Sequence, residues 1–356
     1  MKKINIKKIL EEKAPIIDEA IEKYIPRKYD KDSLVFTLGP PRYEYSLKAL
    51  NKAVAEPIWD FLDRGGKRWR PTLFLLTCEA LGKNAKEFLD FAIIPEVIHN
   101  GTIMIDDIED GSEFRRGKPC THKMFGLDIA INTGNAMYYL PLLSLIKNKD
   151  KVSEVKRNKI YEIYIQEMIN ISFGQATDIM WHKGLERADE KQYLQMCVNK
   201  TGTLARMSAK IAAVLADANS DSVEKIGKFA ESIGVAFQIQ DDILDLVGEE
   251  FAEMKGGLGQ DITEGKRTLM VIHTLEKAET KDRERLLEIL NMHTTDQKLR
   301  DEAINIIKNY GSTEYAKNYA RNIVRESWKD IADALPSSKA KEKLKAFADY
   351  LIARKI

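Results

Sequence analysis

Cysteine, glycine and proline are scarce in this 356-residue chain, which contains 3, 20 and 10 of them. Cys78, Cys120 and Cys197 stand far apart, so the sequence encodes neither a disulfide framework nor a zinc ribbon and suits a reducing cytosol. Charge of one sign is also lacking, because 56 Lys and Arg balance 55 Asp and Glu to a net charge of +1. This balance excludes the basic surface typical of proteins that bind nucleic acids or anionic membranes.

Long hydrophobic runs are missing as well. The chain begins with Met1-Lys2-Lys3, like a signal peptide, but no apolar segment follows. The longest apolar stretch, residues 136–146, is far too short to cross a bilayer. We therefore expect a cytoplasmic protein without a transmembrane segment.

Helical periodicity dominates the rest of the sequence. Apolar residues recur at three- and four-residue spacing in 9–24, 226–237 and 304–323. The alternation typical of strands is nearly absent, and its best instance is 33–37. No turn-rich segment is long enough or biased enough to be an interdomain linker. The sequence predicts an all-α fold, a single bundle of long helices over residues 1–356, in which 1–44 form an N-terminal helical extension.

Two acidic runs follow apolar helical segments. Both have the pattern DDxxD, with aspartates at 106, 107 and 110 and again at 241, 242 and 245. Residues four apart share a helix face, so the first and last aspartates of each run stack. Such carboxylates repel one another unless a cation bridges them, and oxygen ligands of this kind suit Mg²⁺. An EF-hand is excluded, because Ile108 and Gly117 occupy positions that must supply ligands.

The alternative interpretation is a pair of solvated acidic helix faces. One DDxxD arises by chance in roughly 7% of chains this long, and two independent copies in fewer than about 1%. Basic motifs also stand near these aspartates: Gly65-Gly66-Lys67-Arg68-Trp69-Arg70-Pro71, Arg115-Arg116, Lys200-Thr201-Gly202-Thr203 and Gly265-Lys266-Arg267-Thr268. Arginines and helix-start turns bind phosphate through charge-assisted hydrogen bonds. Together the motifs indicate a site for two polyanionic groups, one held through metal and one held directly by Lys and Arg.

The motifs occur in the order typical of the trans-isoprenyl diphosphate synthases, and the chain resembles that family from about residue 45 to the last helices. The run DDIEDGSEFRRGKP, residues 106–119, is most similar to geranylgeranyl diphosphate synthases. A second DDxxD favours chain elongation over the related terpene cyclases. The resemblance implies helices around a deep central cavity, usually in a homodimer, with two aspartate clusters that face each other and bind about three Mg²⁺ ions.

The resemblance also implies roles for individual residues. Asp106, Asp107 and Asp110 would bind Mg²⁺ on the allylic diphosphate, as would Asp241 with support from Asp242 and Asp245. Arg115, Lys200 and Lys266 would contact the same diphosphate. Lys67, Arg70, His99 and Arg116 would bind isopentenyl diphosphate without metal. Thr201 and Gln238 would lie against the developing cation, and Gly174-Gln175 with Asp178 would line the cavity.

For two of these positions, His99 and Lys255, the residues themselves leave an alternative open. His99 lies seven residues before Asp106, two turns along one helix face; a lone His on an apolar helix is more often a core residue, but the resemblance places a substrate-binding histidine here. The family commonly has a lysine four or five residues before the aspartate of Gly259-Gln260-Asp261-Ile262. In this chain the lysine is Lys255, six residues before, and a glycine-rich loop would have to bring it to the substrate.

The implied reaction is ionisation of an allylic diphosphate (dimethylallyl, geranyl or farnesyl), attack by isopentenyl diphosphate, and proton loss to the released pyrophosphate. Gly101 and Thr102 lie about 6–7 Å deeper along the helix than Asp106. Short-product members of the family carry bulky aromatics there, so the resemblance implies that the small residues of this chain leave a cavity that continues past a C15 product. Tyr138 and Tyr139 stand where the family's geranylgeranyl-forming members carry a blocking aromatic pair. These residues predict a C20 product; C15 or C25 and longer products, a non-catalytic subunit and a helical scaffold are the alternatives.

Overall fold

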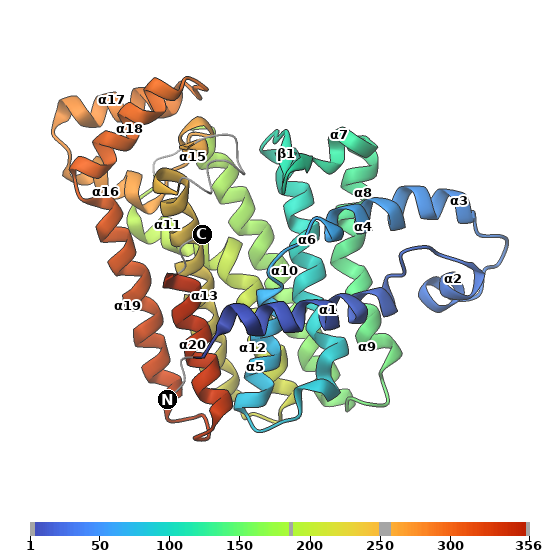
Figure 1. The fold of residues 1–356 in the computed structure, drawn as a ribbon. Helices are drawn as coiled ribbons and strands as arrows, with labels where there is room; N and C mark the ends of the chain where they lie inside the picture. Colours follow the sequence, from blue (N-terminus) through green and yellow to red (C-terminus); the bar gives the residue numbers. More distant parts are fainter. Residues whose placement is uncertain (1–3, 185–187, 249–257, 354–356) are drawn as a thin grey trace. The chain divides into compact units, whose positions relative to one another are not determined.

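The computed structural model describes residues 4–184, 188–248 and 258–353 (Figure 1). Within these ranges almost every ordered element is a helix, and the one sheet is a hairpin of β1 (Phe114–Arg115) and β2 (Lys118–Pro119). The predicted all-α fold is confirmed. The chain divides into two compact units: unit 1 is Met1–Tyr161, Ile211–Ala218 and Pro336–Leu344, and unit 2 is Glu162–Lys210, Asn219–Leu335 and Lys345–Ile356.

Unit 1 is built around α6 (Leu89–Glu109), which packs against α1, α5 and α8. Its other elements are α1 (Ile6–Tyr24), α2 (Lys31–Leu38), α3 (Leu47–Leu50), the π-helix η1 (Asn51–Ala55), α4 (Glu56–Asp63), α5 (Trp69–Ala80), η2 (Ala85–Phe88), α7 (Thr121–Phe125), α8 (Leu127–Tyr139), η3 (Leu140–Leu142) and α9 (Leu143–Lys147).

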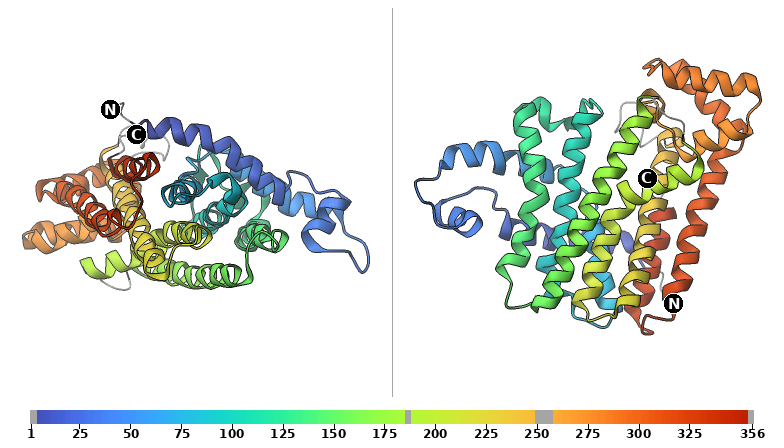
Figure 2. Two further views of the ribbon diagram at one scale, coloured as in Figure 1. Left: turned by 90° about the horizontal axis from the view of Figure 1, so that it is seen from below. Right: turned by 180° about the vertical axis from the view of Figure 1, so that it is seen from behind.

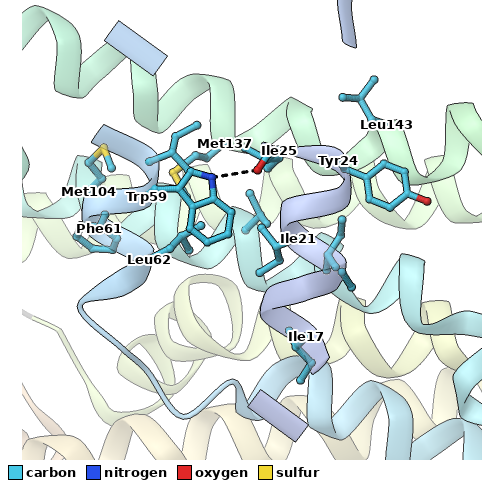
Figure 3. Close-up of a cluster of buried hydrophobic side chains, with 14 residues drawn as sticks. Ile17, Ile21, Tyr24, Ile25, Trp59, Phe61, Leu62, Met104, Met137 and Leu143 are labelled. Atoms are coloured by element: carbon cyan, nitrogen blue, oxygen red, sulfur yellow. Dashed lines mark hydrogen bonds between the residues drawn. The ribbon is translucent and has the colours of Figure 1, made fainter. Parts of the chain in front are cut away.

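The core of unit 1 gathers apolar side chains from α1, α4, α6 and α8 (Figure 3). Within the predicted stripe on α1, Ile17, Ile21 and Tyr24 are buried, whereas Ile16 is exposed. The indole Nε1 of Trp59 donates to the carbonyl oxygen of Ile25 at 3.0 Å, which ties α4 to the end of α1.

The best strand-like segment of the sequence, residues 33–37, belongs to helix α2. A capping box starts this helix: the Asp30 carboxylate accepts from the Ser33 backbone N–H at 2.8 Å, and the Ser33 hydroxyl oxygen accepts from the Asp30 N–H at 2.8 Å. The cap overrides the β propensity of Val35 and Phe36 because it satisfies the donors that a helix start exposes.

One helical stretch of the described chain, Ala85–Glu109, has the length and hydropathy of a membrane span. In its most apolar window 61% of the residues are buried inside the structure, and α6 packs against three helices of unit 1. These features are those of the core helix of a globular unit, and they place the first aspartate run at the end of that helix.

In unit 2, α13 (Ser220–Val247) packs along α19 (Ser312–Ala332), side by side in both views of Figure 2. A π-helix, η4 (Val198–Gly202), contacts α13 and carries Lys200 and Thr201. Further elements are α11 (Glu190–Cys197), α15 (Gln260–Thr263), α16 (Leu269–Lys277), α17 (Thr280–Asn291) and α18 (Gln297–Asn309); α10 (Glu154–His182), α12 (Thr203–Leu215) and α20 (Lys339–Ala353) have residues in both units.

Candidate active site

The first aspartate run ends α6 in unit 1. Asp106 and Asp110 are partly exposed and lie one turn apart, with the Asp110 N–H donating to the Asp106 carbonyl at 2.9 Å. Asp107 is only 1% exposed, and its Oδ1 accepts from Arg115 Nε at 2.7 Å. Burial raises the pKa of the Asp107 carboxyl, although Arg115 opposes that shift. Asp106 and Asp110 therefore present their carboxylates together, while Asp107 is held by an arginine.

Arg115 and Arg116 come from the hairpin that follows α6. Its two-residue turn is Arg116-Gly117, and both residues have positive φ, 51° and 76°. This is the backbone that a two-residue hairpin favours, because it matches the twist of the strands. Arg116 is thereby aimed back into unit 1, where it donates to the Gly65 carbonyl and, at 3.2 Å, to Asn100 Oδ1.

The loop before α5 carries Arg68, which makes structural ion pairs, and it is followed by a second arginine, Arg70. Arg68, at φ 47°, is buried and donates to Asp18 Oδ1 at 2.7 Å and to Glu96 Oε1 at 3.2 Å. Arg70 is also buried, and burial together with the charge of Arg116 lowers its pKa to about 10. Burial lowers the pKa of Arg116 to about 10 as well, with Arg68 and Arg115 contributing. We call Arg68, Arg70, Arg115 and Arg116 the arginine cluster.

His99 lies on α6 beside the arginine cluster. Burial lowers its pKa well below the usual value, and the charges of Arg70 and Arg116 lower it further. The imidazole is therefore neutral at physiological pH and offers one N–H donor. Lys67 is exposed on the adjoining loop. Neutral histidine among cations favours an anion at this place, because an anion offsets the mutual repulsion of the arginines.

Three of the four predicted chain-length residues lie on α6 or against it. A Cβ on Gly101 would come within 2.8 Å of the Gly134 carbonyl oxygen and 3.3 Å of the Tyr138 ring, so Gly101 is where α6 and α8 touch. Thr102 is partly exposed and donates to the His99 carbonyl at 2.8 Å. Burial, then the charges of Glu109 and Asp106, raise the pKa of Tyr138. Tyr139 is 66% exposed, so the two tyrosines point in different directions.

The second aspartate run lies inside α13 in unit 2. Asp241 is partly exposed, whereas Asp242 and Asp245 are buried. Asp242 accepts from the Tyr193 hydroxyl and from Gln238 Nε2, both at 2.8 Å, and the Thr201 hydroxyl donates to Gln238 Oε1 at 2.8 Å. Burial, and then the charge of Asp261, raise the pKa of Asp242 to about 7. Thr201 and Gln238 are thus orientated by one hydrogen-bonded series.

Lys200 is fixed by its backbone and by its charge. A Cβ on Gly174 would lie 2.5 Å from the Lys200 backbone nitrogen, and one on Gly234 would lie 3.1 Å from the Thr201 carbonyl oxygen. Only glycine allows the helices to approach η4 so closely. Lys200 Nζ donates to Asp178 Oδ2 at 2.5 Å. Burial would raise the pKa of Asp178, but Lys200 and His182 outweigh it and hold the pKa well below its usual value.

Asp261 joins the second run to Lys266. The Asp261 N–H donates to Asp245 Oδ2 at 3.0 Å, and Lys266 Nζ lies 3.2 Å from Asp261 Oδ1. The contacts of Asp261 are not predicted from the sequence, and Asp178 is predicted only to line the cavity. The sequence contains a signal for both aspartates, because each stands in a glycine-containing segment that matches the family. Lys255 falls outside the described residues.

The aspartate carboxylates of the two runs suit a hard cation that is also coordinated by a substrate diphosphate. Among the residues that the structure describes, no three Asp, Glu, His or Cys side chains lie close enough to hold a metal ion by themselves. Mg²⁺ normally takes one or two protein carboxylates and completes its shell with water and substrate phosphates. Asp106 with Asp110 in unit 1, and Asp241 in unit 2, meet that requirement, and Asp107 keeps a buried Oδ2 without a hydrogen-bond partner.

Known proteins resemble the chain over most of its length. The polyprenyl synthetase family model matches residues 51–307. A short chain isoprenyl diphosphate synthase of Methanothermobacter thermautotrophicus is 37% identical over 82% of this chain and 87% of its own. A geranylgeranyl diphosphate synthase of Methanosarcina mazei is 33% identical over 82% and 87%.

The fold agrees with these sequence relations. The crystal structure of a geranylgeranyl pyrophosphate synthetase from Pyrococcus horikoshii superposes with a TM-score of 0.84 at 30% identity, covering 98% of both chains. The family resemblance seen in the motifs is confirmed. The chain therefore belongs to the polyprenyl synthetase family of prenyl-transferring enzymes.

Proposed function

We propose that the protein condenses isopentenyl diphosphate with an allylic diphosphate and that its main product is geranylgeranyl diphosphate. One observation carries the proposal. Unit 1 offers two sites of different chemistry for a diphosphate: the carboxylate pair of Asp106 and Asp110, which would act through metal, and the cations Arg70 and Arg116 beside neutral His99, which lies about 10 Å earlier along α6. Two substrates with diphosphate groups, one bound through metal and one bound directly, require two such sites.

The carboxylates hold the metal in this proposal. Asp106 and Asp110 would bind Mg²⁺ in unit 1 and Asp241 would bind Mg²⁺ in unit 2, while Asp107, Asp242 and Asp245 orientate their neighbours through the contacts described above. When bound, Mg²⁺ supplies Lewis-acid stabilisation of the negative charge that develops on the departing diphosphate. The family uses a divalent metal ion.

The cationic side chains bind and orientate the two diphosphates. Arg115, Lys200 and Lys266 would contact the allylic diphosphate, and each is anchored by an aspartate: Asp107, Asp178 and Asp261 respectively. Lys67, Arg70, Arg116 and the N–H of His99 would hold isopentenyl diphosphate, whose double bond attacks the allylic carbon. Preorganised donors of this kind need no reorganisation when charge develops.

Thr201 and Gln238 would face the developing cation with their oxygen atoms. Because the hydroxyl of Thr201 donates to Gln238 Oε1, the lone pairs of Thr201 remain available to a positive charge. The proton lost at the end goes to the released pyrophosphate. Apolar side chains around the reacting carbons must exclude water, which would otherwise capture the cation.

Product length is the finer part of the proposal. We propose that Tyr138, which packs on Gly101, limits the product, and that the exposed Tyr139 does not. Tyr138→Ala should shift products beyond C20, and Tyr139→Ala should leave the length distribution unchanged. Chromatography of dephosphorylated products measures both. If Tyr138→Ala still gives C20 alone, the limit lies elsewhere, and Thr102→Phe tests the α6 position by shortening the product.

We also propose a homodimer. The exposed apolar side chains of unit 1 include Met124 on α7 and Leu127 and Ile131 on α8, which recur at three- and four-residue spacing. Ile165, Ile169 and Phe173 form a similar exposed row on α10 in unit 2. Contiguous apolar rows on a surface are typical of association sites. Light scattering should give twice the chain mass, and Ile131→Glu should reduce it.

The decisive experiment incubates the protein with isopentenyl diphosphate, Mg²⁺ and each allylic primer in turn. Formation of a C20 diphosphate supports the proposal, and a C15 or C25 product corrects its length. Absence of product with every primer would favour the second candidate, a non-catalytic partner subunit. The retention of both DDxxD runs argues against that candidate, since a subunit without catalysis has no use for two metal sites.

A further inference from the structure

The hairpin β1–β2 is too small to fix its own direction. It contains two residue pairs, Phe114 with Pro119 and Arg115 with Lys118. An isolated two-stranded ribbon is marginally stable in water. Its turn also holds Arg116 at φ 51°, a conformation that is uncommon for a residue with a side chain. Contacts from outside the hairpin must therefore set where its arginines point.

Arg64, at the C-terminal end of α4, supplies such contacts. Its side chain is fully buried. One guanidinium nitrogen donates to the carbonyl oxygen of Pro119 at 2.9 Å and to that of Arg115 at 3.3 Å, so it reaches both strands. Another nitrogen lies 3.3 Å from the sulfur of Met124 in α7, the helix that follows the hairpin. A single side chain thus holds β1, β2 and the next helix.

Asp60 holds the other side of the same guanidinium. It lies one turn earlier on α4, and its Oδ2 accepts from Arg64 at 2.6 and 3.1 Å. Its Oδ1 accepts from Lys118 Nζ of β2 at 3.2 Å. Asp60 and Arg64 therefore form a clamp in which α4 is fixed to the backbone and to a side chain of the hairpin.

We propose that Arg64, orientated by Asp60, is a positioning residue for prenyl transfer: it fixes the hairpin so that Arg115 and Arg116 are aimed at the substrate diphosphates. This inference rests on the proposed function, in which those two arginines bind the substrates. The clamp requires a guanidinium and not merely a positive charge. The single nitrogen of a lysine cannot reach two carbonyl oxygens, a sulfur and a carboxylate at once.

Arg64→Lys tests the clamp, and Arg283→Lys is its matched control. Arg283 also donates to two backbone carbonyls, Leu275 O and Ala278 O at 2.8 Å each, but it belongs to unit 2, whereas the hairpin belongs to unit 1. Arg64→Lys should raise the KM for isopentenyl diphosphate about tenfold or more, because a small misplacement of binding groups is costly. Hydrogen exchange of the amides at 114–120 should become faster. Arg283→Lys should change neither quantity.

The outcomes separate a positioning role from a merely structural one. Unchanged KM overturns the proposal, whether or not exchange in the hairpin becomes faster. If Arg64→Lys does not fold, Asp60→Asn replaces it, because Asn keeps the shape and weakens the hold on the guanidinium; the same rise in KM supports the proposal, and an unchanged KM overturns it.

A wild-type protein that makes no prenyl product would defeat the proposed function and leave the clamp testable. In that case calorimetry with inorganic pyrophosphate replaces kinetics. Binding about tenfold weaker in Arg64→Lys than in the wild type, with Arg283→Lys unchanged, would support the positioning role. Equal affinities would overturn it.

Discussion

The two DDxxD runs are identical in pattern, yet units 1 and 2 treat their middle aspartates in opposite ways. In unit 1 the buried Asp107 meets a full positive charge, the guanidinium of Arg115. In unit 2 the hydrogen bonds that the buried Asp242 accepts within the described residues come from neutral donors, Tyr193 and Gln238, and the charge of Lys266 acts on it without a direct ion pair. A motif therefore fixes which carboxylates share a helix face, while the surrounding elements determine the protonation state of each carboxylate.

The runs also differ in how the backbone supports them. The first stands at a helix end, beside a loop and a hairpin in which Arg68 and Arg116 adopt positive φ. The second stands inside α13, where Gly234 lets η4 approach the helix backbone. Unit 1 positions its cations through loops that buried ion pairs hold, and unit 2 positions Lys200 through close packing of helices.

The largest expected effect comes from removing one exposed carboxylate in each run. Asp106→Asn and Asp241→Asn should each lower kcat about a hundredfold or more, because each removes a carboxylate that would hold the metal ion whose charge stabilises the departing diphosphate. Asp217→Asn is the control, since Asp217 pairs with Lys83 and Lys156 on the surface of unit 1 and belongs to neither aspartate run. Steady-state assays measure all three. Full turnover in either run's variant would show that only one run binds metal.

Because Asp107 and Asp242 have different partners, removing those partners should lower the free energy of unfolding by different amounts. Arg115→Met leaves a buried carboxylate without its ion-pair partner and should lower the free energy of unfolding by about 3 kcal/mol. Tyr193→Phe removes one neutral hydrogen bond and should cost only about 1 kcal/mol. Urea unfolding of the metal-free protein measures both. Equal losses would erase the distinction drawn between the two runs.

Glycine contacts offer a third comparison. Gly174→Ala would place a Cβ against the Lys200 backbone, which cannot move without displacing the Lys200 ammonium group. Turnover should therefore fall, and the free energy of unfolding should decrease by about 2 kcal/mol. Gly134→Ala would meet the side chain of Ile105, which can rotate away, and should cost about 1 kcal/mol or less. Thermal unfolding and kinetics of both variants test this order.

The smallest effect is a difference in pH dependence. The pKa of His99 is lowered in the folded protein, so its stabilising contribution is present above the unfolded value near 6.5 and is lost as pH falls below it. The pKa of Asp178 is also lowered, so its contribution is lost only below about pH 4. Asp242, with its pKa raised to about 7, gains protons in the folded protein over the same range and acts alike in the wild type and in His99→Asn. Between pH 7.5 and 5.5, the Tm of the wild type should therefore fall by about 2 °C relative to that of His99→Asn. Asp178→Asn should keep the wild-type slope over this range.

Much of this molecule could be predicted from its sequence. The helices, the aspartate runs and the basic motifs follow from spacing and residue type, because periodicity and charge are local properties. The segment 33–37 was misleading, since the cap that makes it helical comes from Asp30 and Ser33 rather than from its apolar residues.

Side-chain partners were less predictable. No spacing rule distinguishes the structural Arg68 from Arg70, because Asp18 and Glu96, which hold Arg68, are far away in the sequence. Tyr138 and Tyr139 are adjacent and identical in type, and only the packing of α8 on α6 separates them. The role of Arg64 depends on a hairpin about fifty residues later, so no local pattern announces it.

The contact between Gly101 and Gly134 has a consequence for redesign. Because a Cβ on Gly101 would meet the backbone of Gly134, a larger residue at Gly101 changes the spacing of α6 and α8 before it changes the volume available to a growing prenyl chain. Engineers who want shorter products should leave this crossing intact and vary Thr102, whose side chain is partly exposed, where added bulk does not force the helices apart.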